Sequence, residues 1–277
     1  MSKSAQIVAD LRSRESVLVA FSGGVDSAVV AALAYEAVGD RALAVTGVTE
    51  TLAGSDLAHA KRVTAEIGIA HDIVTYSELE NAEFVANPPH RCYVCQGLRM
   101  GAMRDLAARR DYAVVCDGTN ASDPGPDRPG LRAVSEKGIY SPLLVHGVDK
   151  SETREIALQL GLSVWDRPSN ACLSSRVPHG QVVTLSKLRR VEAAEELLLG
   201  EGFRVVRVRH EEAGARVEVG ADEVVRLLEQ WPRLRPRIEA LGFSDAVVDE
   251  RGYRSGGADR PATASTAATA ASSTSRR

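Results

Sequence analysis

The first half of the chain alternates short apolar runs with longer patterns of helical periodicity. Apolar runs predict strands at 16–21, 41–48, 71–75 and 112–116, and helical patterns at 27–38, 56–67 and 95–110 separate them. Strands that alternate with helices are typical of βαβ units with a parallel sheet. Parallel strands are covered on both faces, which explains runs that are apolar throughout rather than alternating. The pattern therefore predicts an α/β fold.

The pattern changes after an irregular stretch between residues 166 and 179, where Pro168, Pro178 and Gly180 interrupt regular structure. Helices are expected at 186–199 and 221–230, and strands at 203–209, 216–219 and 243–248. We therefore expect a nucleotide-binding α/β domain over residues 1–168 and a smaller α+β domain over 178–254. Residues 255–277 are mostly Ser, Thr, Ala, Gly and Arg, and we expect a disordered tail because they offer almost no apolar surface.

Composition narrows the class of protein. The chain has 277 residues, 44% of them hydrophobic, and its 34 basic and 37 acidic side chains give a net charge of −3. These values exclude a disordered protein, and nucleic acid is not an expected partner because binding domains for nucleic acid are usually basic. No apolar signal segment or membrane-spanning run is present. A cytoplasmic protein with no membrane partner is expected, and its four cysteines are then not disulfides.

A glycine-containing segment connects the first predicted strand to the first long helix. It consists of Ser22, Gly23, Gly24, Val25, Asp26 and Ser27. Glycines let the backbone approach a ligand closely, and the N-terminus of the following helix attracts an anion such as phosphate. The lysine of a Walker loop is absent, which favours holding a pyrophosphate leaving group over transferring a phosphoryl group. The alternative is a plain tight turn, but the six residues resemble the PP-loop motif of enzymes that adenylate their substrates with ATP.

A second polar segment follows the strand at 112–116 and supports ATP binding. Ligands of open parallel sheets bind beyond the carboxyl ends of the strands, where this segment and the glycine segment both lie. Gly118 permits close approach, Thr119 and Asn120 offer hydrogen bonds, and Asp123 is expected to help hold Mg²⁺. Residues 46–49, after the second strand, are expected to pass under the adenine. The alternative for residues 116–123 is an ordinary polar loop.

The cysteines suggest sulfur or metal chemistry. Cys92 and Cys95 form a C-x-x-C pair, and Cys172 lies in the irregular stretch near Arg176, which is expected to favour its thiolate. Three thiolates can hold a 4Fe–4S cluster and leave one iron open, whereas a thioredoxin-type dithiol or a zinc site with His90 are the alternatives. Without a cluster, Cys172 alone is the candidate nucleophile. Cys116 is interpreted as a small buried hydrophobe.

Two arginines suggest a phosphate site in the second domain. Arg207 and Arg209 lie two residues apart in a predicted strand and therefore project from one face. Neighbouring guanidinium groups suit a phosphate monoester. The alternative is a solvated strand face paired with Glu218. Arg176 is a further candidate for the same ligand or for AMP.

Together these segments resemble the LarE family of ATP-dependent sulfur transferases. The resemblance rests on 22–27, 90–95, 117–120 and 171–176, and runs from about Val17 to Tyr253. It implies a PP-loop fold and adenylation of a carboxylate of pyridinium-3,5-biscarboxylic acid mononucleotide. A sulfur nucleophile then forms a thiocarboxylate for assembly of the nickel-pincer cofactor. It also implies a homo-oligomer.

The resemblance implies two routes for the sulfur. One branch of the family gives up the sulfur of the cysteine matching Cys172 and lacks the C-x-x-C pair. The other branch holds a 4Fe–4S cluster on three cysteines, which here correspond to Cys92, Cys95 and Cys172. A tRNA thiolation enzyme is the alternative within the same loop chemistry. A ligase similar to NAD synthetase and a non-catalytic nucleotide or iron–sulfur carrier are further alternatives.

Overall fold

The first lobe is built on a four-stranded parallel sheet, as predicted. The computed structural model describes residues 1–123, 129–168, 171–212 and 214–254. The strands are β1 (Val17–Ala20), β2 (Ala42–Val48), β3 (Ala70–Thr75) and β4 (Val114–Cys116), in the order β3-β2-β1-β4. All three pairings are parallel, so the four carboxyl ends lie along one edge of the sheet. The predicted α/β fold is confirmed.

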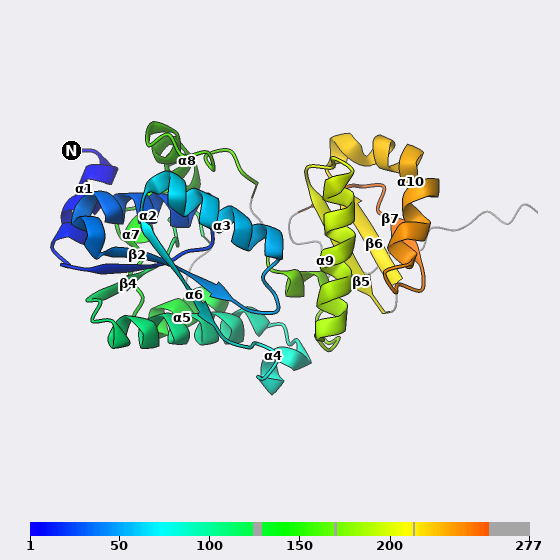
Figure 1. Ribbon diagram of the computed structural model, residues 1–277, viewed down its shortest axis with the longest axis horizontal. Coiled ribbons are helices and arrows are strands. Elements are labelled where there is room, and N and C mark those ends of the chain that lie inside the picture. The colour runs from blue at the N-terminus through cyan, green and yellow to red at the C-terminus, as the bar shows by residue number, and fades with distance from the viewer. Residues whose placement is uncertain (124–128, 169–170, 213, 255–277) are drawn as a thin grey trace, which may run out of the picture.

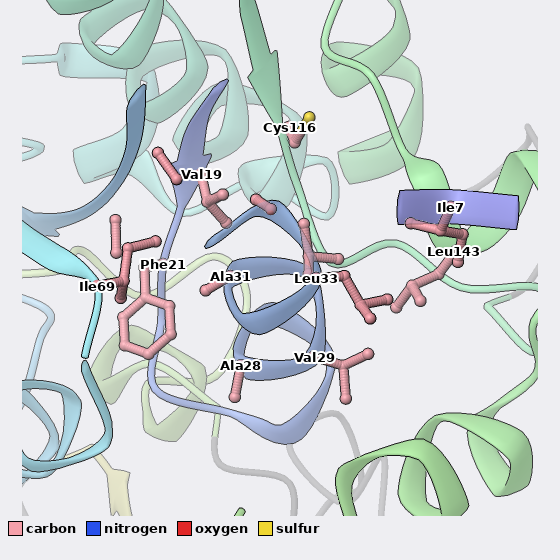
Figure 2. Packing of buried hydrophobic residues seen from close by; sticks show 14 of the residues in the cluster. Ile7, Val19, Phe21, Ala28, Val29, Ala31, Leu33, Ile69, Cys116 and Leu143 are labelled. Carbon is pink, nitrogen blue, oxygen red and sulfur yellow. The ribbon is translucent and has the colours of Figure 1, made fainter. Parts of the chain in front are cut away.

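Helices cover both faces of this sheet (Figure 1). They are α1 (Lys3–Arg12), α2 (Val25–Val38), α3 (Gly54–Ile67), α4 (Ala82–Ala86), α5 (Arg91–Arg109), α6 (Pro129–Glu136), α7 (Pro142–Val145) and α8 (Lys150–Gln159), with the short 3₁₀ turn η1 (Gly39–Arg41). Helix α2 is the centre of the main core, where its Val29 and Leu33 lie among residues from β1, α1 and α7 (Figure 2). Gly68 ends α3 with a φ of +80°, as expected of a left-handed C-cap.

Helix α1 was not expected from the sequence, because its residues are mostly polar. Its buried side chains Ile7, Val8 and Leu11 form one narrow apolar stripe, and the hydroxyl of Ser2 caps its first turn. The stripe packs on α2 in the main core. A short amphipathic helix of this kind takes its stability from packing on a neighbour, which a single-chain pattern reveals poorly.

The second lobe is a three-stranded sheet with two long helices. Its elements are η2 (Leu173–Arg176), α9 (Leu185–Gly200), β5 (Val206–Glu211), β6 (Gly214–Val219), η3 (Ala221–Glu223), α10 (Val224–Glu239) and β7 (Ala246–Val248). Strands β5 and β6 form an antiparallel hairpin, and β7 pairs parallel with β6. Helix α10 extends beyond the expected end at residue 230 despite Pro232 and Pro236, and Leu234 and Ile238 anchor its second half in the core.

The two sheets lie side by side in different lobes (Figure 1) and have separate cores, which is compatible with the expected boundary near residues 168–178. The lobes also share contacts. Phe84 and Cys95 from the first half join the core of the second lobe. The backbone amide of Gly54 donates to the carboxylate of Glu192 on α9, at 2.8 Å. No helix in the described ranges is long and apolar enough to cross a membrane. The expected disordered tail, 255–277, lies outside the described residues.

Candidate functional site

The loop after β1 has the geometry of an anion site. Gly23 has a φ of +77°, and a Cβ there would come within 3.0 Å of the Cα of Ala60 on α3, so a side chain is excluded. The hydroxyls of Ser22 and Ser27 lie 3.1 Å apart. Gly24 caps α2 without a side-chain bond, so no side chain competes for the first amides of the helix. These amides and the helix dipole favour a bound phosphate.

A positively charged side chain lies beside this loop. The Nζ atom of Lys150, the first residue of α8, pairs with the carboxylate of Asp26 in the loop. The side-chain amide of Asn120 donates to the other oxygen of Asp26, at 3.0 Å. Lys150 was not identified from the sequence, because 123 residues separate it from Asp26 and no local motif contains it.

The segment after β4 lies behind the loop. A Cβ on Gly118 would come within 2.8 Å of the backbone nitrogen of Ser27, so Gly118 is required for this packing. The hydroxyl of Thr119 donates to the carboxylate of Asp117, and burial raises the pKa of that carboxyl. The backbone amide of Asn120 donates to Asp123 at 3.1 Å. Gly118, Thr119, Asn120 and Asp123 are not among the described residues that line the cavity at the loop, so their assignment to ATP remains a prediction.

A cavity of about 210 Å³ opens in front of the loop. The loop contributes Ser22, Gly24, Val25 and Asp26, and the segment after β2 contributes Gly47, Thr49, Thr51 and Leu52. Asp56, Arg99, Lys150, Arg167, Pro168, Ala171 and Cys172 complete the lining. The carboxyl ends of β1 and β2 thus meet at one pocket, as expected for a parallel sheet. Cys172 shares that pocket with the phosphate loop.

Of the three candidate cysteines, Cys172 is the one found among the described residues that line this cavity. Cys95 is buried, and Cys172, half-buried, lies close enough to interact with it electrostatically. Cys92 is exposed one turn earlier on α5. The C-x-x-C pair therefore lies within the first turns of a helix that was expected to begin only at Cys95. Cys116 is fully buried in the main core, and burial raises the pKa of its thiol, which confirms its interpretation as a small hydrophobe.

The surroundings of Cys95 were not expected. Its Sγ donates to Oε1 of Glu78 at 2.8 Å, and Arg99 lies 3.9 Å from the same sulfur. Burial raises the pKa of the Cys95 thiol. Glu78 is fully buried and also accepts hydrogen bonds from the hydroxyls of Thr49 and Thr51. A lone Glu after a strand carries no signal in the sequence, because its partners come from two other segments, residues 49–51 and helix α5.

The donor set is chemically suited to an iron–sulfur cluster, since thiolates are the usual ligands. The thiols of Cys95 and Cys172 interact electrostatically, and Cys92 lies one turn before Cys95 on α5. Within the described ranges, however, no group of three or more His, Cys, Asp or Glu side chains is arranged to hold a metal ion. In this structure Cys95 donates its proton to Glu78, so binding of a metal would have to replace that hydrogen bond.

A second cavity, of about 330 Å³, lies between α3 and the second lobe. Arg176 and Arg207, both predicted to bind substrate, are among its lining residues, with Tyr253 nearby. Arg207 is buried, and its guanidinium lies 5.0 Å from the centre of the Tyr253 ring. Burial and the neighbouring Arg176 lower the pKa of Arg207, because two cations share a desolvated space. An anionic ligand would relieve that repulsion.

Arg176 and Arg209 have protein partners. The guanidinium of Arg176 pairs with both carboxylate oxygens of Glu195, at 2.8 and 2.9 Å, and donates to the carbonyl oxygen of Cys172 at 3.0 Å. Arg209 pairs with Glu218 at 3.0 Å, as the alternative interpretation of this strand had it, but the face is buried rather than solvated. Arg209 is not among the described residues that line the second cavity.

The comparisons with known proteins agree with this geometry. The asparagine synthase family profile matches residues 5–106, the part that holds the phosphate loop. The chain is 33% identical to the pyridinium-3,5-bisthiocarboxylic acid mononucleotide synthase of Lactiplantibacillus plantarum over 92% of both chains. It is also 38% identical to an uncharacterised protein of Synechocystis sp., over 89% of this chain and 92% of that one. A tRNA-specific 2-thiouridylase of Rhizorhabdus wittichii is 31% identical, over 90% of this chain and 78% of the relative.

The alignment with the Lactiplantibacillus synthase covers 92% of this chain, so it extends over both lobes. The 2-thiouridylase is matched over a smaller share of its own length, so the tRNA thiolation alternative is not favoured. The chain is a PP-loop protein and belongs to the family of the pyridinium-3,5-bisthiocarboxylic acid mononucleotide synthase, LarE.

Proposed function

We propose that this protein is an ATP-dependent sulfur transferase. It adenylates a carboxylate of pyridinium-3,5-biscarboxylic acid mononucleotide and releases pyrophosphate. A sulfur nucleophile then attacks the acyl-adenylate, AMP leaves, and the resulting thiocarboxylate serves nickel-pincer cofactor assembly. One observation carries the proposal: Cys172 lines the same cavity as Ser22, Gly24 and Asp26 of the phosphate loop. A sulfur atom beside a nucleotide pocket is placed to attack an acyl-adenylate formed there.

The phosphate loop and Lys150 hold the β- and γ-phosphates of ATP, because the helix amides and the cation lie together at that end of the cavity. Mg²⁺ accompanies the nucleotide, and the Asp26 carboxylate in the cavity lining is the candidate protein ligand. Asp123, the ligand expected from the sequence, is not among the described residues that line the cavity, and its role with Mg²⁺ remains a prediction. The second cavity takes the nucleotide substrate, with Arg207 as the cation for its phosphate and Arg176 beside it.

Cys92, Cys95 and Cys172 are proposed to hold a 4Fe–4S cluster, which would supply a sulfide for transfer. The closeness of Cys95 and Cys172 supports this set. In the absence of a cluster Cys172 is the nucleophile itself. The protein is further proposed to be cytoplasmic and homo-oligomeric. The four unpaired thiols support the first, and exposed apolar side chains on α7, such as Val145, support the second.

The decisive experiment incubates the anaerobically purified protein with ATP, Mg²⁺ and pyridinium-3,5-biscarboxylic acid mononucleotide. We expect pyrophosphate release that depends on the carboxylate, and a thiocarboxylate product detected by mass spectrometry. Replacing Cys172 by Ser should abolish the thiocarboxylate and retain pyrophosphate release, because the phosphate loop is intact. A Cys172→Ser variant that still makes product would refute its assigned role.

Two further measurements separate the sulfur routes. Iron content and visible absorbance after anaerobic reconstitution report the cluster, and a matched Cys116→Ser variant should retain both because Cys116 belongs to the core. The intact mass of the protein after turnover reports the sulfur source. Loss of sulfur from Cys172 indicates self-sacrifice, and an unchanged mass indicates a sulfur supplied from elsewhere.

A further inference from the structure

The nucleotide cavity and the second cavity adjoin. Four of the described residues line both of them: Asp56, Arg167, Pro168 and Ala171. Asp56 lies in the first turn of α3, and the other three belong to the segment that leads from the first lobe to the second. These four residues therefore border both a ligand in the first cavity and a ligand in the second.

Arg167 is the one cation among these four shared residues of the described chain. Each of the other basic residues among the described lining residues borders only one of the two cavities. Lys150 is at the phosphate loop, and Arg99 is beside Cys95; both line the first cavity. Arg62, Arg176, Arg204 and Arg207 line the second cavity alone. Arg167 thus stands where a nucleotide in the first cavity and a substrate in the second would meet.

Adenylation brings two anions together at that place. A carboxylate oxygen attacks the α-phosphorus of ATP and forms a new P–O bond. The bond from that phosphorus to the bridging oxygen of the β-phosphate breaks, and pyrophosphate leaves with the electron pair. Both reactants carry negative charge near the reacting atoms, so a cation between them lowers the barrier.

We propose that Arg167 is a catalytic residue of the adenylation step, with its guanidinium contacting both the α-phosphate of ATP and the carboxylate of the substrate. This inference rests on the proposed function and deepens it. A guanidinium has several donors in a planar fork, so it can bond to oxygens of two different anions at once. Its place between the two cavities is what distinguishes it from the other cations.

The protein holds Arg167 from two sides. Its Nη2 pairs with Oδ1 of Asp56 at 3.0 Å. Its backbone carbonyl accepts from Arg154 at 3.1 Å, and Arg154 also donates to the carbonyl of Trp165 at 2.7 Å. The side chain is thus oriented before any ligand arrives, which lowers the reorganisation needed during reaction.

A purely structural role does not explain the pair well. The side chains of Arg167 and Asp56 are 30% and 17% exposed, and ion pairs with this access to water contribute little to stability. The pair of Arg110 with Asp72 is a suitable control, because it is also partly exposed and neither residue is among the described residues that line either cavity.

The test compares Arg167→Gln, Arg167→Lys and the control Arg110→Gln. Carboxylate-dependent pyrophosphate release is measured with pyridinium-3,5-biscarboxylic acid mononucleotide, and calorimetry with a non-hydrolysable ATP analogue gives the affinity for nucleotide. We expect Arg167→Gln to lower kcat by about 100-fold, with a smaller change in nucleotide affinity and an unchanged melting temperature. Arg167→Lys should recover part of the rate, because the charge remains and the fork is lost. Arg110→Gln should behave like the parent protein.

Three results would overturn the proposal. The first is a parental kcat in Arg167→Gln. The second is a loss of nucleotide affinity with kcat unchanged, which would make Arg167 a ligand of ATP alone. If Arg167→Gln does not fold, a parental kcat in both Arg167→Lys and Asp56→Asn is the third. A parent protein that releases no pyrophosphate with this substrate refutes the proposed function itself, and the assignment of Arg167 with it.

Discussion

The phosphate loop of the first lobe and the arginine face of the β5–β6 hairpin, both proposed to bind an anion, are built by different means. The loop uses backbone amides, a helix N-terminus and glycines that exclude side chains. The hairpin uses guanidinium groups within a buried network of charges. A backbone site is local in the chain. A site made of arginine side chains depends on which carboxylates the fold places beside them.

Arg207 and Arg209 show this dependence within one strand. They project from the same face of β5, two residues apart, and both are buried. Arg209 forms a two-bond pair with Glu218, whereas Arg207 stacks over Tyr253 at the second cavity. The same residue type on the same face therefore has a structural partner in one case and a ligand cavity in the other.

The largest effect on stability is expected from Arg209→Met. Glu218 is buried, so removing one of its cations leaves its charge poorly compensated, at a cost of about 3 kcal/mol in the free energy of unfolding. Chemical denaturation measures this value. Arg207→Met is the matched variant: it relieves repulsion with Arg176, should weaken binding of the substrate phosphate, and should lower stability less than Arg209→Met does. Equal destabilisation by both substitutions would contradict the distinction between the two arginines.

A smaller effect, about 2 kcal/mol, is expected from Gly118→Ala. The added methyl group would meet the backbone of Ser27 and Asp26, and neither can move without displacing the phosphate loop. We expect ATP affinity to fall together with stability, as measured by calorimetry and thermal unfolding. Gly97→Ala on α5 is the control, because a Cβ there meets nothing within 4 Å, and it should stabilise the helix by about 0.5–1 kcal/mol. Parental ATP affinity in Gly118→Ala would show that the loop tolerates movement.

The smallest effect is expected in the pH dependence of stability, through a histidine on the apolar face of the β5–β6 hairpin. His210 on β5 is buried and packs on Phe243, 5.5 Å between ring centres. Burial lowers its pKa, and Lys187 and Arg190 on α9 lower it further. The fold thus favours the neutral ring. Its contribution to stability is complete above the unfolded pKa of about 6.5 and is lost as the pH falls below that value.

Unfolding of the parent protein and of His210→Phe by urea between pH 5 and 8 measures this contribution. The difference between the two curves should change in the acidic part of the range and be constant in the alkaline part. His59 and His71 also have pKa values lowered by burial, and they cancel in the difference because both proteins contain them. A difference that does not vary with pH would show that folding leaves the pKa of His210 unchanged.

The sequence predicted the parallel sheet, the phosphate loop and the core role of Cys116, because each depends on neighbours in the chain. The run from Val17 to Ala20 followed by Gly23 and Gly24 defines strand, turn and helix within a short segment. The carboxyl ends of the parallel strands then determine where the nucleotide cavity lies. The start of α5 was predicted late, since Arg91 follows two prolines and its cap, His90, makes no side-chain capping bond.

The residues that the sequence did not reveal are charged side chains whose partners lie far along the chain. Glu78 meets Thr49, Thr51 and Cys95 only in the folded protein. Lys150 and Arg167 reach the nucleotide cavity from segments with no motif. Which charged side chains pair depends on tertiary contacts, so neither the periodicity nor the residue spacing of the sequence identifies the pairs.

The short segment around Cys172 is fastened to both halves of the molecule. The amide of Leu173 donates to Thr51 at 3.0 Å, beside the nucleotide, while Arg176 joins the carbonyl of Cys172 to Glu195 on α9. A hinge motion between the lobes would therefore strain the hydrogen bonds that Leu173 and Arg176 form next to that sulfur. A spectroscopic reporter on residue 172 would register opening and closing of the whole molecule before either sheet had changed.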